Sequence, residues 1–162
     1  MTTDETISAL LKRVQQLEDA QAIRELKASY GMGSDRAAAA EMTAKFAPDG
    51  ILEIERYGIA RGKDEILQFY SGARFSWMCH YMVPMSVEVA PDGRTASGQW
   101  RLWELASSFA STDSPAQAVW IAGLYHDDFV KIDGVWKFSH VRLRLDLISP
   151  YEQGWLRQRF LS

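Results

Sequence analysis

Two Asp-Gly turns, each set between two long alternating segments, constrain the second half of the chain more than any other feature. Segments 80–90 and 94–109 flank the first turn, and segments 118–132 and 135–148 flank the second. Asp-Gly between alternating segments is a strong local signal for a β-hairpin. The second half is therefore predicted to fold as two hairpins of one long antiparallel sheet.

The first half has a helical pattern instead. Apolar side chains recur at three- and four-residue steps over residues 4–32, which predicts one long helix. Asp19 is a candidate N-cap, so a break at this point is the alternative. Shorter helices are expected over residues 35–46 and 63–73, with a short strand over residues 51–58 between them.

Helices followed by a long sheet indicate an α+β domain. We expect a strongly curved antiparallel sheet that the N-terminal helices close into a cone with an apolar interior. The 162 residues fit a single domain spanning residues 1–162, and 47% of them are hydrophobic. This content is sufficient to wall an internal cavity.

Charge and hydropathy exclude several kinds of partner. The net charge is −3 without basic runs, which argues against a nucleic-acid partner. No stretch approaches the roughly 20 apolar residues of a membrane span, and the first residues lack the basic and apolar parts of a secretion signal. The single Cys79 excludes an internal disulfide and fits a reducing compartment. A cytoplasmic protein is expected.

An acidic residue at the end of the long helix is expected to meet a histidine of the sheet. Asp35 follows the helix and His80 begins the first hairpin. A carboxylate bound to one ring nitrogen fixes the imidazole tautomer and leaves the other nitrogen as a base. Imidazole has an unperturbed pKa of about 6.5, so such a pair suits proton abstraction near neutral pH. Tyr30 could offer its hydroxyl to a leaving group or a developing oxyanion.

The segment from Tyr125 to Asp128 carries a second set of candidates. Tyr125 and His126 point to opposite faces of their strand, so only one of them can face the interior. Three adjacent strand residues cannot converge on one ion, which argues against a metal site in His126-Asp127-Asp128. A solvated face explains Asp127 and Asp128 better.

Regular alternation along the last strand places His140, Arg142 and Arg144 on one face, together with Trp136 and Phe138. An imidazole and two guanidiniums beside two aromatic rings are unusual for a purely structural face. Two interpretations stay open for the arginines, namely contact with a substrate and pairing with acidic residues at a subunit interface. For His140 a contact with the substrate is the expected role.

The opposite face of the last strand would carry Val141, Leu143 and Leu145. An exposed apolar face on a curved sheet is usually covered by partner subunits. A homodimer or homotrimer is therefore expected.

Several segments resemble the SnoaL-like branch of the NTF2-like superfamily and follow one another in the expected order. They are AIRELKASYGMGSDR, FAPDGILEI, the Gly62-Lys63-Asp64 turn, HYMVPMSVEV and YHDDFVKIDGVWKFSH. The resemblance implies a cone-shaped α+β barrel with a cystatin-like fold. Within that branch the chain is similar to cofactor-free lyases, namely bile-acid 7α-dehydratases, scytalone dehydratases and hexachlorocyclohexane dehydrochlorinases.

Those lyases imply an Asp–His pair, and the matching positions here are Asp35 and His80. The resemblance also implies pocket positions for Tyr30 and Tyr125. It further implies a late-strand arginine, for which Arg142 and Arg144 compete.

The expected function is that of a cofactor-independent lyase, without a metal ion. The reaction would be an elimination such as dehydration, or the retro-aldol loss of a small aldehyde such as formaldehyde. The Trp and Phe content favours a small hydrophobic cyclic or aromatic hydroxylated substrate, with Tyr57 and Trp103 as further candidate contacts. The alternatives are a ketosteroid-isomerase-like isomerase and a non-catalytic ligand-binding domain.

Overall fold

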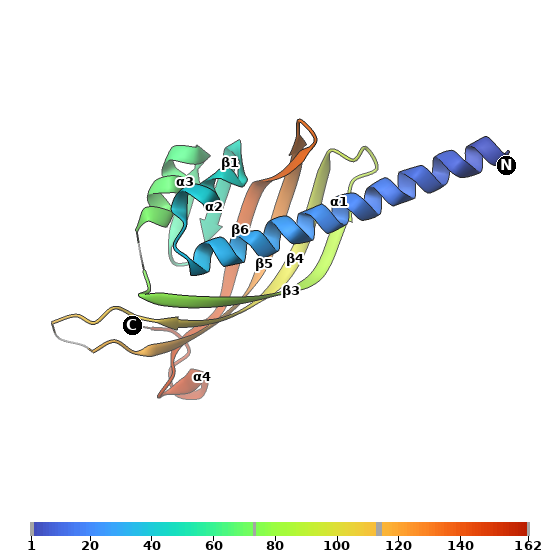
Figure 1. The fold of residues 1–162 in the computed structure, drawn as a ribbon. Coiled ribbons are helices and arrows are strands. Elements are labelled where there is room, and N and C mark those ends of the chain that lie inside the picture. The colour runs from blue at the N-terminus through green and yellow to red at the C-terminus, as the bar shows by residue number, and fades with distance from the viewer. Residues whose placement is uncertain (1, 73, 113–114, 162) are drawn as a thin grey trace.

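The computed structural model describes residues 2–72, 74–112 and 115–161, which form one long helix packed on a curved sheet (Figure 1). This arrangement confirms the predicted α+β class. The helices are α1 (Thr3–Asp35), α2 (Ala39–Ala44), α3 (Gly62–Ser71) and α4 (Gly154–Arg157). The strands are β1 (Phe46–Ile54), β2 (Gly58–Arg61), β3 (Trp77–Val89), β4 (Thr95–Ser107), β5 (Ala118–Ile132) and β6 (Val135–Pro150).

The six strands form one sheet in the order β2-β1-β6-β5-β4-β3. Both predicted hairpins are present, because β3 pairs antiparallel with β4, and β5 pairs antiparallel with β6. The prediction of a wholly antiparallel sheet is wrong at one pair, since β1 runs parallel to β6. After β2 the chain passes through α3 to β3 at the opposite edge, and three antiparallel steps then bring β6 back beside β1 in the same direction.

The first strand begins earlier than expected. β1 includes Pro48 and Asp49, which lie before residue 51, the predicted start of the strand. Its pairing with β6 is irregular between Phe46 and Ile51. Proline has no N–H to donate, so an irregular stretch of the ladder can hold it without losing a hydrogen bond.

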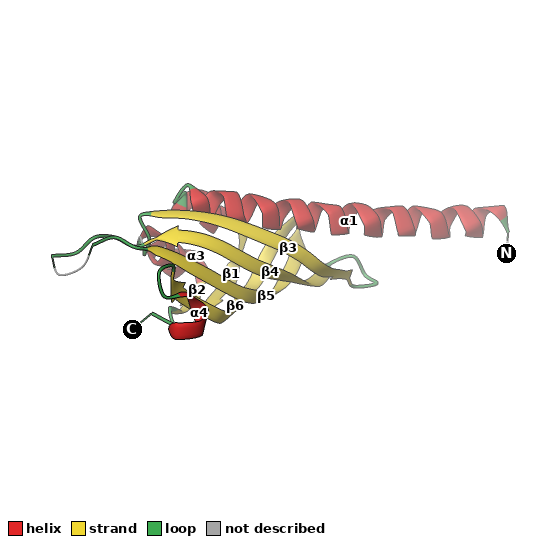
Figure 2. Cartoon of the chain, turned by 90° about the horizontal axis from the view of Figure 1, so that it is seen from below, coloured by secondary structure: helices red, strands yellow, loops and turns green. Residues whose placement is uncertain are grey.

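Helix α1 is continuous over 33 residues, so the alternative of a break near Asp19 is wrong. Asp19 is buried and accepts a hydrogen bond of 3.0 Å from Nε1 of Trp136, and it also pairs with Lys131. It therefore fixes the middle of the helix to the β5–β6 hairpin. The half of α1 that precedes Asp19 projects beyond the sheet in both views (Figures 1 and 2). Among the described residues, no helix combines the length and apolar composition needed to cross a membrane.

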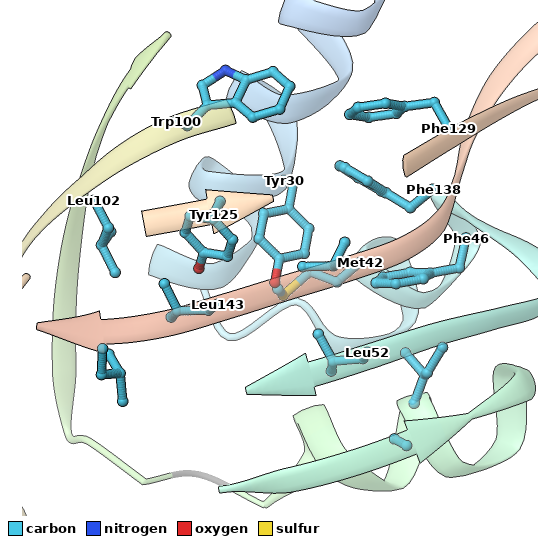
Figure 3. Packing of buried hydrophobic residues seen from close by; sticks show 14 of the residues in the cluster. Tyr30, Met42, Phe46, Leu52, Trp100, Leu102, Tyr125, Phe129, Phe138 and Leu143 are labelled. Atoms are coloured by element: carbon cyan, nitrogen blue, oxygen red, sulfur yellow. The ribbon is translucent and has the colours of Figure 1, made fainter. Parts of the chain in front are cut away.

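One extra residue in β6 exchanges the two faces of this strand. Phe138 pairs with Phe129, but His140 pairs with Asp128, so Ser139 is an additional residue between them. Before this bulge the even-numbered residues face the interior, where Phe138 packs on Phe129 with ring centroids 5.1 Å apart (Figure 3). From Val141 to Leu145 the odd-numbered residues face inward, and a second register shift at Asp146 precedes the buried Ile148. The predicted regular alternation is therefore wrong.

The apolar residues that follow the bulge lie in the core. Val141, Leu143 and Leu145 are all buried against the interior of the cone. They therefore cannot form the exposed apolar face from which a subunit contact was expected. The homodimer or homotrimer stays a prediction, without this support.

Candidate active site

A cavity of about 130 Å³ lies between the inner face of the sheet and the ends of α1, α2 and α3. An engineered protein cavity of about 150 Å³ binds benzene, so this space is about the size of one six-membered ring. Most of its walls are apolar or aromatic. The lining side chains include Met42, Ile54, Tyr57, Phe69, Tyr70, Phe75, Met78, Ile121, Leu143 and Leu145, together with the polar residues described below.

Asp35 and His80 contact each other at this cavity. Oδ1 of Asp35 lies 2.6 Å from Nδ1 of His80 and also accepts a hydrogen bond of 3.0 Å from the His80 backbone N–H. Gly31, one helical turn before Asp35, faces the same strand: a Cβ there would lie 3.4 Å from the Met82 side chain and 3.8 Å from Cβ of His80, which are ordinary van der Waals distances.

The second ring nitrogen of His80 faces Glu104. Nε2 of His80 lies 3.3 Å from Oε2 of Glu104, and both side chains are only 6% exposed. The two residues are direct partners in the β3–β4 ladder, which brings their side chains to the same face of the sheet. The imidazole is thus held between two carboxyl groups, of which Asp35 is the more exposed.

Burial raises the pKa of Glu104 to about 7, the negative charge of Asp35 adds to this rise, and His80 opposes it. A carboxyl group with this pKa exchanges its proton near neutral pH. Sequence reasoning missed Glu104. A signal was present, because alternation in β4 places it with Trp100, Leu102 and Ala106 on the buried face. A lone carboxylate on an apolar strand face indicates a functional role.

Three tyrosine hydroxyls meet at the base of the cavity. Tyr70 donates a hydrogen bond of 2.8 Å to the hydroxyl oxygen of Tyr30, and Tyr125 also bonds to Tyr30. The rings of Tyr30 and Tyr125 lie side by side, edge to face (Figure 3). Burial raises the pKa of all three, so they stay protonated at neutral pH. Because Tyr30 accepts from its neighbours, its own proton is available to an oxygen in the cavity.

A buried ion pair lies behind the tyrosines. Nζ of Lys27 is 2.7 Å from Oδ2 of Asp127 and 3.3 Å from the ring centroid of Tyr125, and neither charged side chain is exposed. Burial lowers the pKa of Lys27 and raises that of Asp127, while their mutual attraction opposes both shifts. The assignment of Asp127 to a solvated face is therefore wrong, although Asp128 does lie on the outer face with Arg142.

Tyr57 lines the cavity as expected, and a cation accompanies it. The guanidinium of Arg74 lies 4.9 Å from the ring centroid of Tyr57 and 4.1 Å from that of Phe69. Arg74 itself lines the cavity. It was not among the sequence-based candidates, because it lies in the irregular segment between α3 and β3, where no periodicity assigns a face.

The late-strand cations lie on the other side of the sheet. His140 pairs with Glu53 at 3.1 Å, and Arg142 pairs with Asp128 at 2.7 Å, while Arg144 is exposed. All three follow the bulge in β6 and point outward, so none of them lines this cavity, and their expected substrate contacts stay predictions. His126 also faces outward, as expected once Tyr125 faces inward.

Trp103 also lies outside the cavity. It is on the outer face of β4, where its ring centroid is 5.1 Å from that of Trp120 and 6.4 Å from that of Trp155. In the ladder it falls between the inward-facing residues Leu102 and Glu104. Trp103 therefore does not line this cavity, and its expected contact with a substrate stays a prediction.

A family model described as the SnoaL-like domain matches residues 15–142 of the chain. This match covers most of α1 and the sheet through the middle of β6. It therefore includes every residue of the cavity named above except Leu143 and Leu145.

Solved structures share the fold at low identity. Hexachlorocyclohexane dehydrochlorinase LinA-type3 from Novosphingobium barchaimii is 22% identical, with a TM-score of 0.75 over 85% of this chain and 93% of its own. A protein from Novosphingobium aromaticivorans that is predicted to be a scytalone dehydratase is 22% identical, with a TM-score of 0.73 over 86% of this chain and 91% of its own. An NTF2-like protein with a cystatin-like fold from the latter organism is 21% identical, with a TM-score of 0.67 over 85% and 88%. The predicted NTF2-like, cystatin-like fold is confirmed.

Proposed function

Because this chain belongs to the SnoaL-like domain family, we propose that its cavity is the active site of a cofactor-independent lyase. The observation that carries the proposal is the imidazole of His80, held between Asp35 at 2.6 Å and Glu104 at 3.3 Å. Similar folds that include a dehydrochlorinase and a predicted dehydratase support an elimination reaction. The walls of the cavity favour a small hydrophobic ring that carries a hydroxyl group.

In a dehydration, neutral His80 removes a proton from carbon through Nε2. The C–H electrons form a C=C bond, the adjacent C–O bond breaks, and the leaving oxygen takes the proton of Glu104 to depart as water. The charged imidazolium is stabilised by Asp35. Return of the proton from Nε2 to Glu104 across 3.3 Å then restores both residues. Each such proton transfer contributes about 10²–10⁴-fold to the rate.

The two proton-transfer groups lie on neighbouring strands of one cavity wall. They therefore approach the substrate from the same side, and the geometry favours a syn elimination. Tyr30 stabilises negative charge on a ring oxygen with its free proton, which is worth about 10²–10³-fold for one such donor. In a retro-aldol reaction the same base would take the proton of a hydroxyl group, a C–C bond would break, and the carbanion would be protonated as the aldehyde departs.

The experiment is a screen of cyclic and aromatic hydroxylated compounds with product detection by mass spectrometry. Loss of the mass of water or of a small aldehyde supports the lyase. Asp35→Asn and His80→Ala are expected to abolish turnover and to leave the circular-dichroism spectrum unchanged. Asp128→Asn is the matched control, since it changes a carboxylate on the outer face.

Three results would contradict the proposal. Full activity of either the Asp35 or the His80 variant removes the mechanism. A product of unchanged mass with a shifted double bond identifies an isomerase that uses the same base. Saturable binding of ring compounds without any product across the screen identifies a ligand-binding domain.

A further inference from the structure

In the part of α1 that precedes Asp19, the described chain buries no residue. This part of α1 projects past the sheet in both views (Figures 1 and 2). The family match begins only at residue 15, so most of this projection is an addition to the family domain. Isolated helices of about 12–15 residues are marginal in water, which makes an unsupported helix of this length unusual.

The projection carries an apolar seam. Its members are separated by three and four residues and are 49–70% exposed, which leaves large side chains in water; they are Ile7, Leu10, Leu11, Val14 and Leu17. In a seven-residue repeat, Ile7 and Val14 take the first position (a), and Leu10 and Leu17 take the fourth (d). This is the spacing that lets two helices pack knobs into holes.

The seam faces away from the protein's own sheet. The residues of α1 that pack on the sheet include Ala20, Ile23, Lys27 and Tyr30. At 100° per residue, their mean direction is roughly 155° from that of the seam. A partner helix can therefore pack on the seam without contacting the folded domain that carries the seam.

We propose that this segment pairs with the same segment of a second copy of the chain, as a parallel two-stranded coiled coil. The choice of side chains supports two strands, because β-branched residues at a (Ile7, Val14) with leucine at d (Leu10, Leu17) favour parallel dimers. Two heptads are short, and the pairing therefore brings two folded domains together through a small, specific contact.

Charge supports the parallel direction. Arg13 precedes an a position and Glu18 follows a d position, five residues later, which are the two positions that face each other across a parallel seam. Both residues are exposed, and neither has an ion-pair partner within the described residues. An antiparallel arrangement would instead bring Arg13 toward Arg13 of the second copy.

Cysteine cross-linking tests the arrangement in the full chain. Leu10→Cys and Leu17→Cys are made separately in a Cys79→Ala background and oxidised. In a parallel seam each d residue lies against the same residue of the second copy, so both variants are expected to form interchain disulfides. Cross-linking at only one position indicates antiparallel pairing and overturns the proposal, as does cross-linking at neither.

Substitutions test the seam itself. Leu10→Glu/Leu17→Glu is expected to abolish the helix-mediated dimer in analytical ultracentrifugation, whereas Ser8→Glu/Ala9→Glu adds the same charge off the seam and is expected to leave it intact. Arg13→Glu should weaken dimerisation about tenfold, and adding Glu18→Arg should restore it. Equal molar masses for the seam variant and its control, or no recovery in the charge-swapped double variant, would overturn the proposal.

Discussion

Glu104 Oε2 lies 3.3 Å from Nε2 of His80, on the side of the imidazole opposite Asp35. In the proposed mechanism one carboxyl group orients the ring, and the other shares a proton with its free nitrogen. The pKa of Glu104, raised by burial to about 7, makes this sharing possible at neutral pH. The difference between the two carboxyl groups assigns them separate roles.

The first prediction concerns the pH dependence of turnover. Because Glu104 must donate a proton, kcat is expected to fall as the pH rises through about 7. Glu104→Gln should lower kcat by about 10²-fold or more and should remove this alkaline decline. Measured pH profiles of both proteins test this. An unchanged alkaline decline in the variant would assign the titration to another group.

The second prediction concerns stability. The pKa of Glu104 rises from 4.5 to about 7 on folding, so ionisation of this group opposes folding by about 3 kcal/mol. Its contribution to stability is complete below pH 4.5 and is lost as the pH rises through about 7. Glu104→Gln should therefore match the wild type in acid and exceed it above neutrality. Urea unfolding across the pH range measures the difference, with Glu88→Gln on the exposed surface as control.

The third prediction separates the tyrosines. Tyr30→Phe should lower kcat about 10²-fold, because it removes the proton offered to the substrate oxygen. Tyr70→Phe removes only the hydrogen bond of 2.8 Å to Tyr30 and should lower kcat no more than about tenfold. Phenylalanine keeps the ring packing in both variants. Steady-state kinetics with the same substrate compare the two variants. An equal loss of kcat in both would contradict the larger role assigned to Tyr30.

The fourth prediction concerns the buried pair. Lys27→Met leaves Asp127 buried without its partner and should lower the free energy of unfolding by about 3–5 kcal/mol. Lys27→Met/Asp127→Leu removes both charges and should recover much of this loss. Denaturant unfolding of the two variants measures the coupling. A double variant as unstable as the single one would show that the cation over the Tyr125 ring matters more than the unpaired charge.

The fifth prediction compares two arginines. Arg74 lines the cavity. Arg74→Ala should raise KM for a ring substrate, because it removes the cation beside the rings of Tyr57 and Phe69. Arg142→Ala removes a surface ion pair worth about 0–1 kcal/mol and should leave kcat/KM unchanged. Comparing KM and kcat/KM of the two variants shows which face of the sheet contacts the substrate. Loss of activity in the Arg142 variant would restore the role expected from the sequence.

Local patterns predicted the fold class and both hairpins, because features a few residues long, such as the Asp-Gly turns, determine them. The contact of Asp35 with His80 joins residues that are 45 positions apart, and it was expected from the chemistry of an Asp–His pair and from the resemblance to the lyases. The burial of Lys27 could not be read in this way, since its partner Asp127 is one hundred residues away in the chain. The buried position of Glu104 could have been predicted from the sequence, because its strand alternates regularly.

The prediction for the last strand was wrong for a different reason. Its alternation is regular in the sequence, and only the pairing with β5 shows that Ser139 is an extra residue. This feature determines what changes the strand can accept. Replacing one side chain alters one contact. Deleting Ser139 would turn the bulge into a regular ladder in which Phe138, Val141 and Leu143 still point inward, and His140, Arg142 and Arg144 still point outward. β6 should therefore accept the loss of this one residue without exchanging its two faces.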